Sequence, residues 1–157
     1  MLPIKRILWP TDFSEASCEA LKAANELALH FSAELILVHV VPPLHIMPTA
    51  EAPEHFHTSS YPLEMEASAR DALRQVVEKN VSKEIKTNAM VIHGNLGNVA
   101  DEIVNVADHE KTDIIIIATH GQTGWRRFMF GSVAEKVIRM APCPVLSIQF
   151  PPEEGEE

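Results

Sequence analysis

Short apolar runs alternate along the chain with longer stretches in which apolar residues recur at helical spacing. The two clearest runs are the four isoleucines at 114–117, which are β-branched and unbroken, and Glu34–Val41, which is longer and rich in β-branched residues. Such runs are typical of strands buried on both faces, as in a parallel sheet. The pattern predicts strands over Ile4–Trp9, Glu34–Val41, Thr87–His93, 114–117 and Pro144–Phe150.

Four helices are predicted between these strands. Ser14 is expected to cap the first helix, the third ends before Lys111, and the fourth runs from Val133 to about Ala141–Pro142. The first helix is expected to bury one face, which carries Leu21, Ala24, Leu27, Ala28 and Phe31 at helical spacing. Apolar residues also mark the second and third helices: Met65, Ala69, Ala72, Leu73, Val76 and Val77; and Val99, Ile103 and Ala107.

The order β-α-β-α-β-α-β-α-β predicts an α/β fold, namely a doubly wound five-stranded parallel sheet with helices on both faces. In such sheets a ligand sits at the carboxyl ends of the strands, where the strand order reverses. We expect residues 1–150 to form one domain and the acidic residues 151–157 to be a disordered tail. The proline-rich segment Pro42–Pro62 is either a flap beside the ligand crevice or a variable surface excursion.

Composition and charge argue against several classes of function. The 157 residues are 46% apolar and carry a net charge of −9, with a pI near 5.3, which argues against general nucleic-acid binding. No apolar run is long enough to span a bilayer, and no signal-peptide pattern opens the chain. Cys18 and Cys143 have no metal-type spacing, so we expect a reduced, cytoplasmic protein. His55 and His57 lack a third placed ligand, so we predict no metal site.

The most informative stretch is Asp113–Ser132, in which a strand leads through a glycine-containing loop to a helix N-terminus. Ser132 is predicted to cap that helix, with Glu135 completing a capping box. Backbone N–H groups and the helix dipole at such a junction favour an anion, and a glycine at 131 lets the backbone approach it closely. The phosphate-loop pattern GxxxxGK[ST] is absent.

This stretch resembles the nucleotide signature of the universal stress protein family, which is Gly, two residues, Gly, nine residues, Gly and then Ser or Thr. Here Ala118 takes the place of the first glycine, Gly121 is the second, and Gly131-Ser132 closes the pattern. Pro10-Thr11-Asp12-Phe13-Ser14, Val38-His39-Val40 and Ala141-Pro142-Cys143-Pro144-Val145-Leu146 also resemble segments of the family, in order. The resemblance implies a Rossmann-like, adenine nucleotide alpha hydrolase-like fold with strand order 3-2-1-4-5.

The resemblance also implies a nucleotide site, with Val40 on the base and Thr11 and Asp12 facing the base and ribose. Asp12 could instead cap the first helix, and Arg126 and Arg127 either contact phosphate or form a solvated pair. We expect alanine to be tolerated at 118 because it directly follows the strand. The implied nucleotide-binding residues are Pro10, Thr11, Asp12, Val40, Ala118, Thr119, His120, Gly121, Gly131, Ser132, Val133 and Ala134.

The function implied by the resemblance is ATP binding by a regulatory, stress-response module, with Mg²⁺ held mainly by the triphosphate. No catalytic residue is predicted, because no general base with a defined geometry is visible. A slow or partner-dependent ATPase, and an interaction module whose site has lapsed through Ala118, remain open. The resemblance further implies a homodimer formed through the last strand, at Val145, Leu146 and Ile148; neither nucleic acid nor a membrane is an expected partner, whereas a protein partner is left open.

Overall fold

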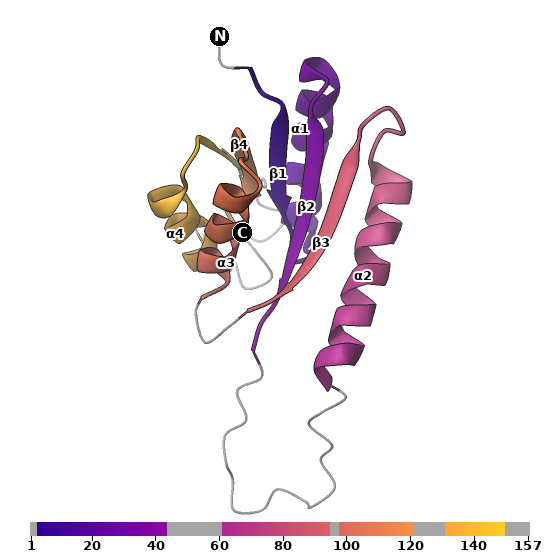
Figure 1. Ribbon diagram of the computed structural model, residues 1–157, viewed down its shortest axis with the longest axis vertical. Coiled ribbons are helices and arrows are strands. Elements are labelled where there is room, and N and C mark those ends of the chain that lie inside the picture. The colour runs from indigo at the N-terminus through magenta and orange to yellow at the C-terminus, as the bar shows by residue number, and fades with distance from the viewer. Residues whose placement is uncertain (1–2, 44–60, 95–97, 121–130, 150–157) are drawn as a thin grey trace, which may run out of the picture.

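The computed structural model describes residues 3–43, 61–94, 98–120 and 131–149. Five strands and four helices alternate along them (Figure 1). The strands are β1 (Arg6–Pro10), β2 (Glu34–Val41), β3 (Thr87–His93), β4 (Ile114–Ala118) and β5 (Val145–Ile148). The helices are α1 (Glu15–Phe31), α2 (Tyr61–Asn80), α3 (Val99–His109) and α4 (Ser132–Met140).

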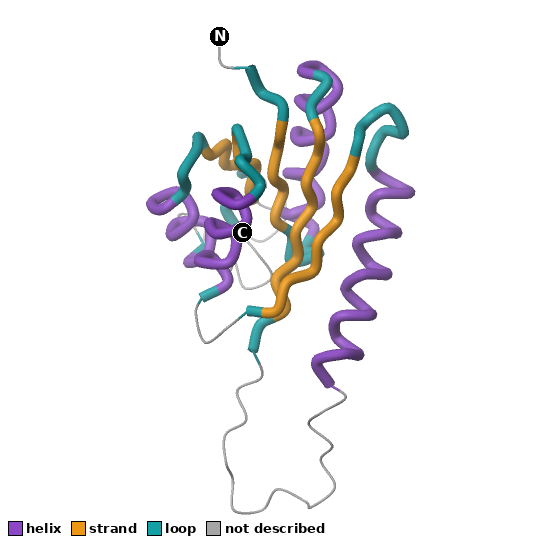
Figure 2. The backbone as a smooth tube through the Cα atoms, in the orientation of Figure 1, coloured by secondary structure: helices purple, strands orange, loops and turns teal. Residues whose placement is uncertain are grey.

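The strands form one parallel sheet in the order β3-β2-β1-β4-β5, which confirms the predicted fold class and strand order (Figure 2). The order reverses between β1 and β4, since β1 pairs with β2 on one side and with β4 on the other. In a doubly wound sheet this reversal opens a crevice at the carboxyl ends of the strands.

Helices cover both faces of the sheet, and this explains the unbroken apolar runs. Because successive strand residues point to opposite faces, each central strand supplies two cores. Ile7, Trp9 and Ile116 face α1 and α2, whereas Leu8 and Ile115 face α3 and α4. All five side chains are fully buried. Figure 1 shows α3 and α4 together on one side of the sheet, with α1 and α2 on the other.

Several predicted boundaries shift by a few residues. β1 begins at Arg6 and includes Pro10, and β5 ends at Ile148. α2 begins at Tyr61, so the last two residues of the segment predicted as a flap or surface excursion are helical. Proline is tolerated in the first turn of a helix, where its missing N–H has no intrahelical partner. Residues 44–60 of that segment, and the predicted acidic tail, lie outside the described residues.

The structure also bears on membrane and metal binding. Within the described residues, no helix is long and apolar enough to cross a membrane. The same residues hold no cluster of three or more His, Cys, Asp or Glu side chains that could bind a metal ion.

Candidate functional site

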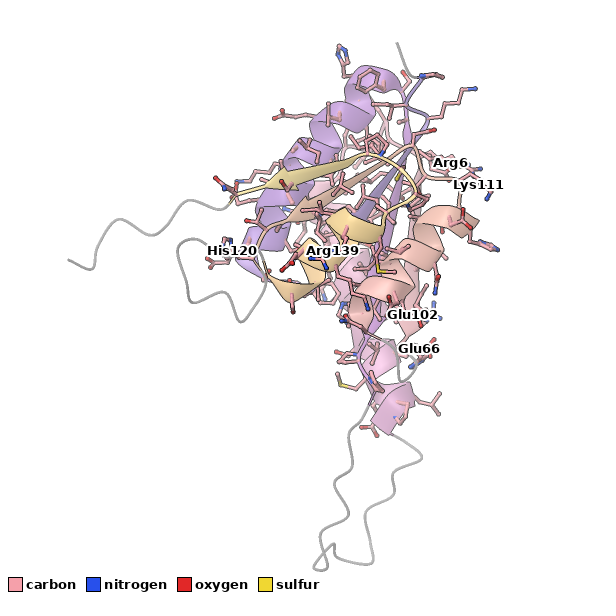
Figure 3. The ribbon with its side chains drawn as sticks, turned by 90° about the vertical axis from the view of Figure 1, so that its left-hand side faces the viewer. Arg6, Glu66, Glu102, Lys111, His120 and Arg139 are labelled. Carbon is pink, nitrogen blue, oxygen red and sulfur yellow. The ribbon has the colours of Figure 1, made fainter. Side chains whose placement is uncertain are left out.

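A crevice of about 570 Å³ lies at the carboxyl ends of β1, β2 and β4. His120, which follows β4, marks this end of the sheet, and Arg6 marks the other (Figure 3). All of the described residues that the sequence assigned to a nucleotide site line the crevice. They are Pro10, Thr11, Asp12, Val40, Ala118, Thr119, His120, Gly131, Ser132, Val133 and Ala134. Gly121, Arg126 and Arg127 lie outside the described residues.

The loop between β1 and α1 is held by its own side chains. The Thr11 hydroxyl accepts a hydrogen bond from Phe13 N at 2.9 Å and another from Ser17 Oγ at 2.6 Å. Asp12 Oδ1 accepts from Ser14 N at 3.0 Å, and Ser14 in turn caps α1, as predicted. Because Thr11 is buried and accepts both of these hydrogen bonds, its hydroxyl holds the loop in place. Asp12 supports the turn before α1 and also lines the crevice.

The end of β2 presents backbone groups to the crevice. β1 pairs with β2 only as far as Pro10 opposite Val38, and Thr11 N donates to Val38 O at 2.9 Å. In a parallel ladder, alternate residues direct both N–H and C=O to the same neighbouring strand. Val40 lies two residues beyond Val38, so its N–H and C=O point toward β1 past the last paired residue. They supply a donor and an acceptor in the plane of the sheet.

Within the described part of the chain, no side chain caps the N-terminus of α4. Gly131 is the N-cap residue, and its N–H donates to Thr119 O at 2.6 Å, which joins the end of β4 to the start of the helix. By contrast, the side chains of Ser14 and Asn98 accept backbone N–H groups at the starts of α1 and α3. The first N–H groups of a helix have no intrahelical partner. At α4 these groups belong to Ser132–Ala134, all of which line the crevice.

The predicted N-cap was therefore wrong by one residue, and the predicted capping box is not formed. Ser132 is the first helical residue, so its side chain does not cap α4, and Glu135 accepts a hydrogen bond from Arg139 at 2.7 Å instead of reaching back. Gly131 has φ −56° and ψ 146°, which any residue can adopt.

Ala118 is the last residue of β4, and among the described non-glycine residues only Phe13, Ser32 and Lys111 have positive φ. Alanine thus meets no backbone strain at 118.

An ion pair fixes α4 against α3 near the crevice. Lys136 Nζ donates to Asp101 Oδ2 at 2.8 Å, and Asp101 also completes the capping box of α3. The hydrogen bond from Lys136 holds the pKa of the Asp101 carboxyl below its usual value. The pair links the first turn of α3 to α4.

Charge is sparse on the described crevice wall. Among its described residues only Asp12 carries a formal charge, beside the two imidazoles of His39 and His120. The Thr119 hydroxyl and His120 Nδ1 lie 2.8 Å apart, and Thr119 is buried. The described wall contains no lysine or arginine. Any attraction for an anion from this part of the chain therefore comes from the backbone N–H groups and the dipole of α4.

Sequence reasoning missed the residues that extend the crevice onto both faces of the sheet. Val99 and Ile103 were used only to predict a helix, but they line the crevice from the start of α3. Met65, Ala69 and Ala72 line it from the N-terminal part of α2. The order of the elements could have predicted these residues, because a helix that follows a parallel strand starts at that strand's carboxyl end, where the crevice lies. The further lining residues are Phe13, Ser17, Val38, His39, Pro42, Ser68 and Ile117.

Comparisons of the sequence and of the structure with known proteins all identify the same family. The model of the universal stress protein family matches residues 3–149. Universal stress protein MJ0531 of Methanocaldococcus jannaschii is 34% identical over 150 residues, which cover 96% of this chain and 85% of that protein. The solved structure of universal stress protein UspA from Lactobacillus plantarum superposes with a TM-score of 0.73 at 25% identity, covering 94% of this chain and 99% of the other.

Two further solved structures share the fold and hold a nucleotide. A universal stress protein in complex with cAMP has a TM-score of 0.62 at 20% identity, covering 94% of this chain and 98% of that one. The universal stress protein from Archaeoglobus fulgidus in complex with dAMP has a TM-score of 0.60 at 20% identity, with the same coverage of 94% and 98%. At this identity the likeness extends to the fold alone.

Proposed function

The chain belongs to the universal stress protein family, and we propose that its crevice binds an adenine nucleotide, with ATP as the preferred ligand. The protein would then act as a nucleotide-loaded regulatory module. The crevice lies where the strand order reverses between β1 and β4, which is where doubly wound sheets bind their ligands.

The observation that carries this proposal is the uncapped start of α4. Among the residues that the structure describes, no side chain accepts the N–H groups of Ser132, Val133 and Ala134, and these three residues line the crevice. Phosphate oxygens are suited to such groups, because they accept several hydrogen bonds and benefit from the positive end of the helix dipole. With the phosphates at α4, the rest of the nucleotide extends across the ends of β1 and β2.

The base end of the proposed site is the edge of β2. The Val40 N–H and C=O offer the donor and acceptor that the Watson–Crick edge of adenine complements, and Val40 and Ile103 provide apolar surface on one side. The complexes with cAMP and dAMP agree with this proposal, since they are adenine nucleotides held by the same fold. The departure from the family signature at Ala118 does not argue for a lapsed site, because the backbone there is ordinary strand.

Mg²⁺, if required, would be held mainly by the triphosphate, since magnesium keeps several water ligands and needs few from the protein. Within the described crevice wall, Asp12 is the sole carboxylate. Affinity for ATP that is equal in EDTA and in Mg²⁺ would remove the case for the metal. The alternative of a slow ATPase is measured separately, by multiple-turnover release of phosphate.

The test of binding has two parts. Mass spectrometry of the small molecules released from heat-denatured protein identifies any nucleotide that copurifies. Calorimetry on nucleotide-free protein then measures the affinity for ATP. We expect an adenine nucleotide in the first experiment and saturable, one-to-one binding in the second. Protein that carries no nucleotide and gives no heat with ATP would contradict the proposal.

We also propose a homodimer formed through β5. This strand is at the edge of the sheet, and Leu146 on it is 37% exposed. Ile138 and Met140 at the end of α4 are exposed apolar residues as well. An exposed apolar edge strand is a site for pairing with another chain. A single domain over residues 1–150 and a cytoplasmic location remain predictions.

A further inference from the structure

The crevice has a part on the α1/α2 face of the sheet to which the proposed function assigns no role. We call this part the rear compartment; its lining residues are Phe13, Ser17, His39, Met65, Ala69 and Ala72. None of these side chains carries a formal charge, apart from the imidazole when it is protonated. The two alanines are short side chains on a helix whose neighbouring turns are anchored to the core by Leu73 and Val77. The compartment therefore suits a planar, uncharged group.

His39 supplies the distinctive polar atom of the rear compartment. Its Nδ1 lies 2.8 Å from Thr11 O. A backbone carbonyl can only accept, so Nδ1 must carry the proton and donate. In the neutral ring this fixes Nε2 as an acceptor. Nε2 is at the outer edge of the ring, away from the strand, and has no hydrogen-bond partner among the described residues.

The ring of His39 is held in place from two sides. The Phe13 ring packs against it at a centroid distance of 4.6 Å with an interplanar angle of 34°. Phe13 has φ 63°, an unusual backbone conformation for an aromatic residue, and its N–H donates to the Thr11 hydroxyl. The same loop thus positions Phe13 and offers the carbonyl that orients the imidazole. A fixed acceptor on a fixed ring is suited to recognising a donor on a ligand.

We propose that His39 is a specificity-determining residue, whose Nε2 accepts a hydrogen bond from the 6-amino group of the adenine base. This inference rests on the proposed function. His39 is adjacent to Val40, whose backbone groups lie in the plane of the sheet, and its side chain lies on the α1/α2 face. A base at this edge has its 6-substituent beside both residues. A purine with a carbonyl at position 6 places two acceptors against each other, and it is rejected.

The test compares ATP with inosine triphosphate, which has a carbonyl at position 6 in place of the amino group. Calorimetry on wild type and on His39→Asn gives the ratio of the two affinities. The asparagine amide reaches the position of Nδ1 and can still donate to Thr11 O, but nothing replaces Nε2. We expect ATP affinity to fall by about tenfold, as for the loss of one hydrogen bond. Inosine triphosphate affinity should not fall, because the acceptor that faces its carbonyl has been removed.

A second variant, His39→Gln, separates recognition from a structural role. The glutamine amide reaches the position of Nε2 and can present either its oxygen or its NH₂ group. We expect it to keep ATP affinity within about threefold and to gain about tenfold for inosine triphosphate, because its NH₂ group can donate to the carbonyl. The two variants then lose selectivity in opposite ways, which a change in loop structure would not produce.

His109→Asn is the matched control, because His109 is at the exposed end of α3, outside the crevice. It should leave both affinities unchanged. Equal losses for the two nucleotides in His39→Asn, or an unchanged ratio in both His39 variants, would overturn the role of His39 while leaving nucleotide binding intact. Wild type that binds neither nucleotide would refute the proposed function, and this inference with it.

Discussion

A side-chain cap introduced at Gly131 should stabilise the protein and weaken its binding of ATP. Gly131 is the N-cap of α4 and has extended backbone angles, so aspartate and asparagine fit there without strain. Both are good N-cap residues, and each would accept one of the N–H groups that we assign to phosphate. Asparagine and aspartate have almost the same shape. The pair therefore separates the effect of capping from the effect of charge.

The magnitudes follow from the geometry. Replacing a glycine cap by asparagine stabilises a helix by only about 0.3 kcal/mol, and the charge of aspartate adds about 0.3–1 kcal/mol through the dipole. Occupying one amide costs a nucleotide roughly one hydrogen bond, or about tenfold in affinity. A carboxylate about 5 Å from a phosphate charge, at an effective dielectric constant of about 20, costs about 3 kcal/mol more, a further factor of roughly 100.

The assay pairs thermal unfolding of nucleotide-free protein with calorimetry on ATP. Stability should rise in the order wild type, Gly131→Asn, Gly131→Asp, and ATP affinity should fall in the same order. Raising the salt concentration should narrow the difference in affinity between the two variants, because it is electrostatic. If Gly131→Asp binds ATP as well as Gly131→Asn does, no phosphate lies at the start of α4 and the site assignment is incorrect.

Three further predictions test the fold, an ion pair and the proposed dimer. Asn98→Ala removes the side chain that accepts Ala100 N and should lower the free energy of unfolding by about 1 kcal/mol in urea denaturation, with an unchanged m value; a loss of less than about 0.3 kcal/mol would count against the cap. Hydrogen bonds from His93 and then Arg70 hold the pKa of Glu66 below 4.5. The stability that Glu66 contributes should therefore be full above that pH and disappear as pH falls through the lowered pKa, so a difference between wild type and Glu66→Gln that persists in strong acid would contradict this coupling. Leu146→Glu should convert a dimer to a monomer in light scattering at micromolar concentration, because it places charge on the exposed edge strand; a wild type that is already monomeric would contradict the proposed interface.

The sequence predicted the fold well because the apolar pattern was strong at the strands. The isoleucines at 114–117 could only form a strand with both faces covered, and in the structure Ile115 and Ile116 are buried against opposite helical layers. Alternation of strands and helices then led to the parallel sheet, while the strand order came from the family resemblance. The predicted ends of the helices and strands were less accurate than their order. Capping at Ser132 was wrong by one residue, because a serine at the first helical position has the same local sequence as a capping serine.

The candidate site was predictable where it lies on loops at strand ends, and less so elsewhere. Thr11 was expected to face the ligand, but its hydroxyl is used within the loop by Phe13 and Ser17, a pairing that depends on the folded turn. His39 lies within an apolar strand, and nothing in its spacing distinguishes it from a core residue. Its orientation follows from the Thr11 carbonyl in the loop after β1, a contact between residues 28 positions apart.

The most direct test of the nucleotide site is a titration of ¹⁵N-labelled protein with ATP, followed by NMR of the backbone amides. We expect large, saturable shifts for Ser132, Val133 and Ala134, where hydrogen bonds to phosphate form, and for Val40, where the base binds. Adenosine should shift Val40 and leave the three α4 amides nearly unchanged, because it has no phosphate. Shifts confined to other parts of the sheet, or none at all with ATP, would contradict the assignment of this crevice as an adenine nucleotide site.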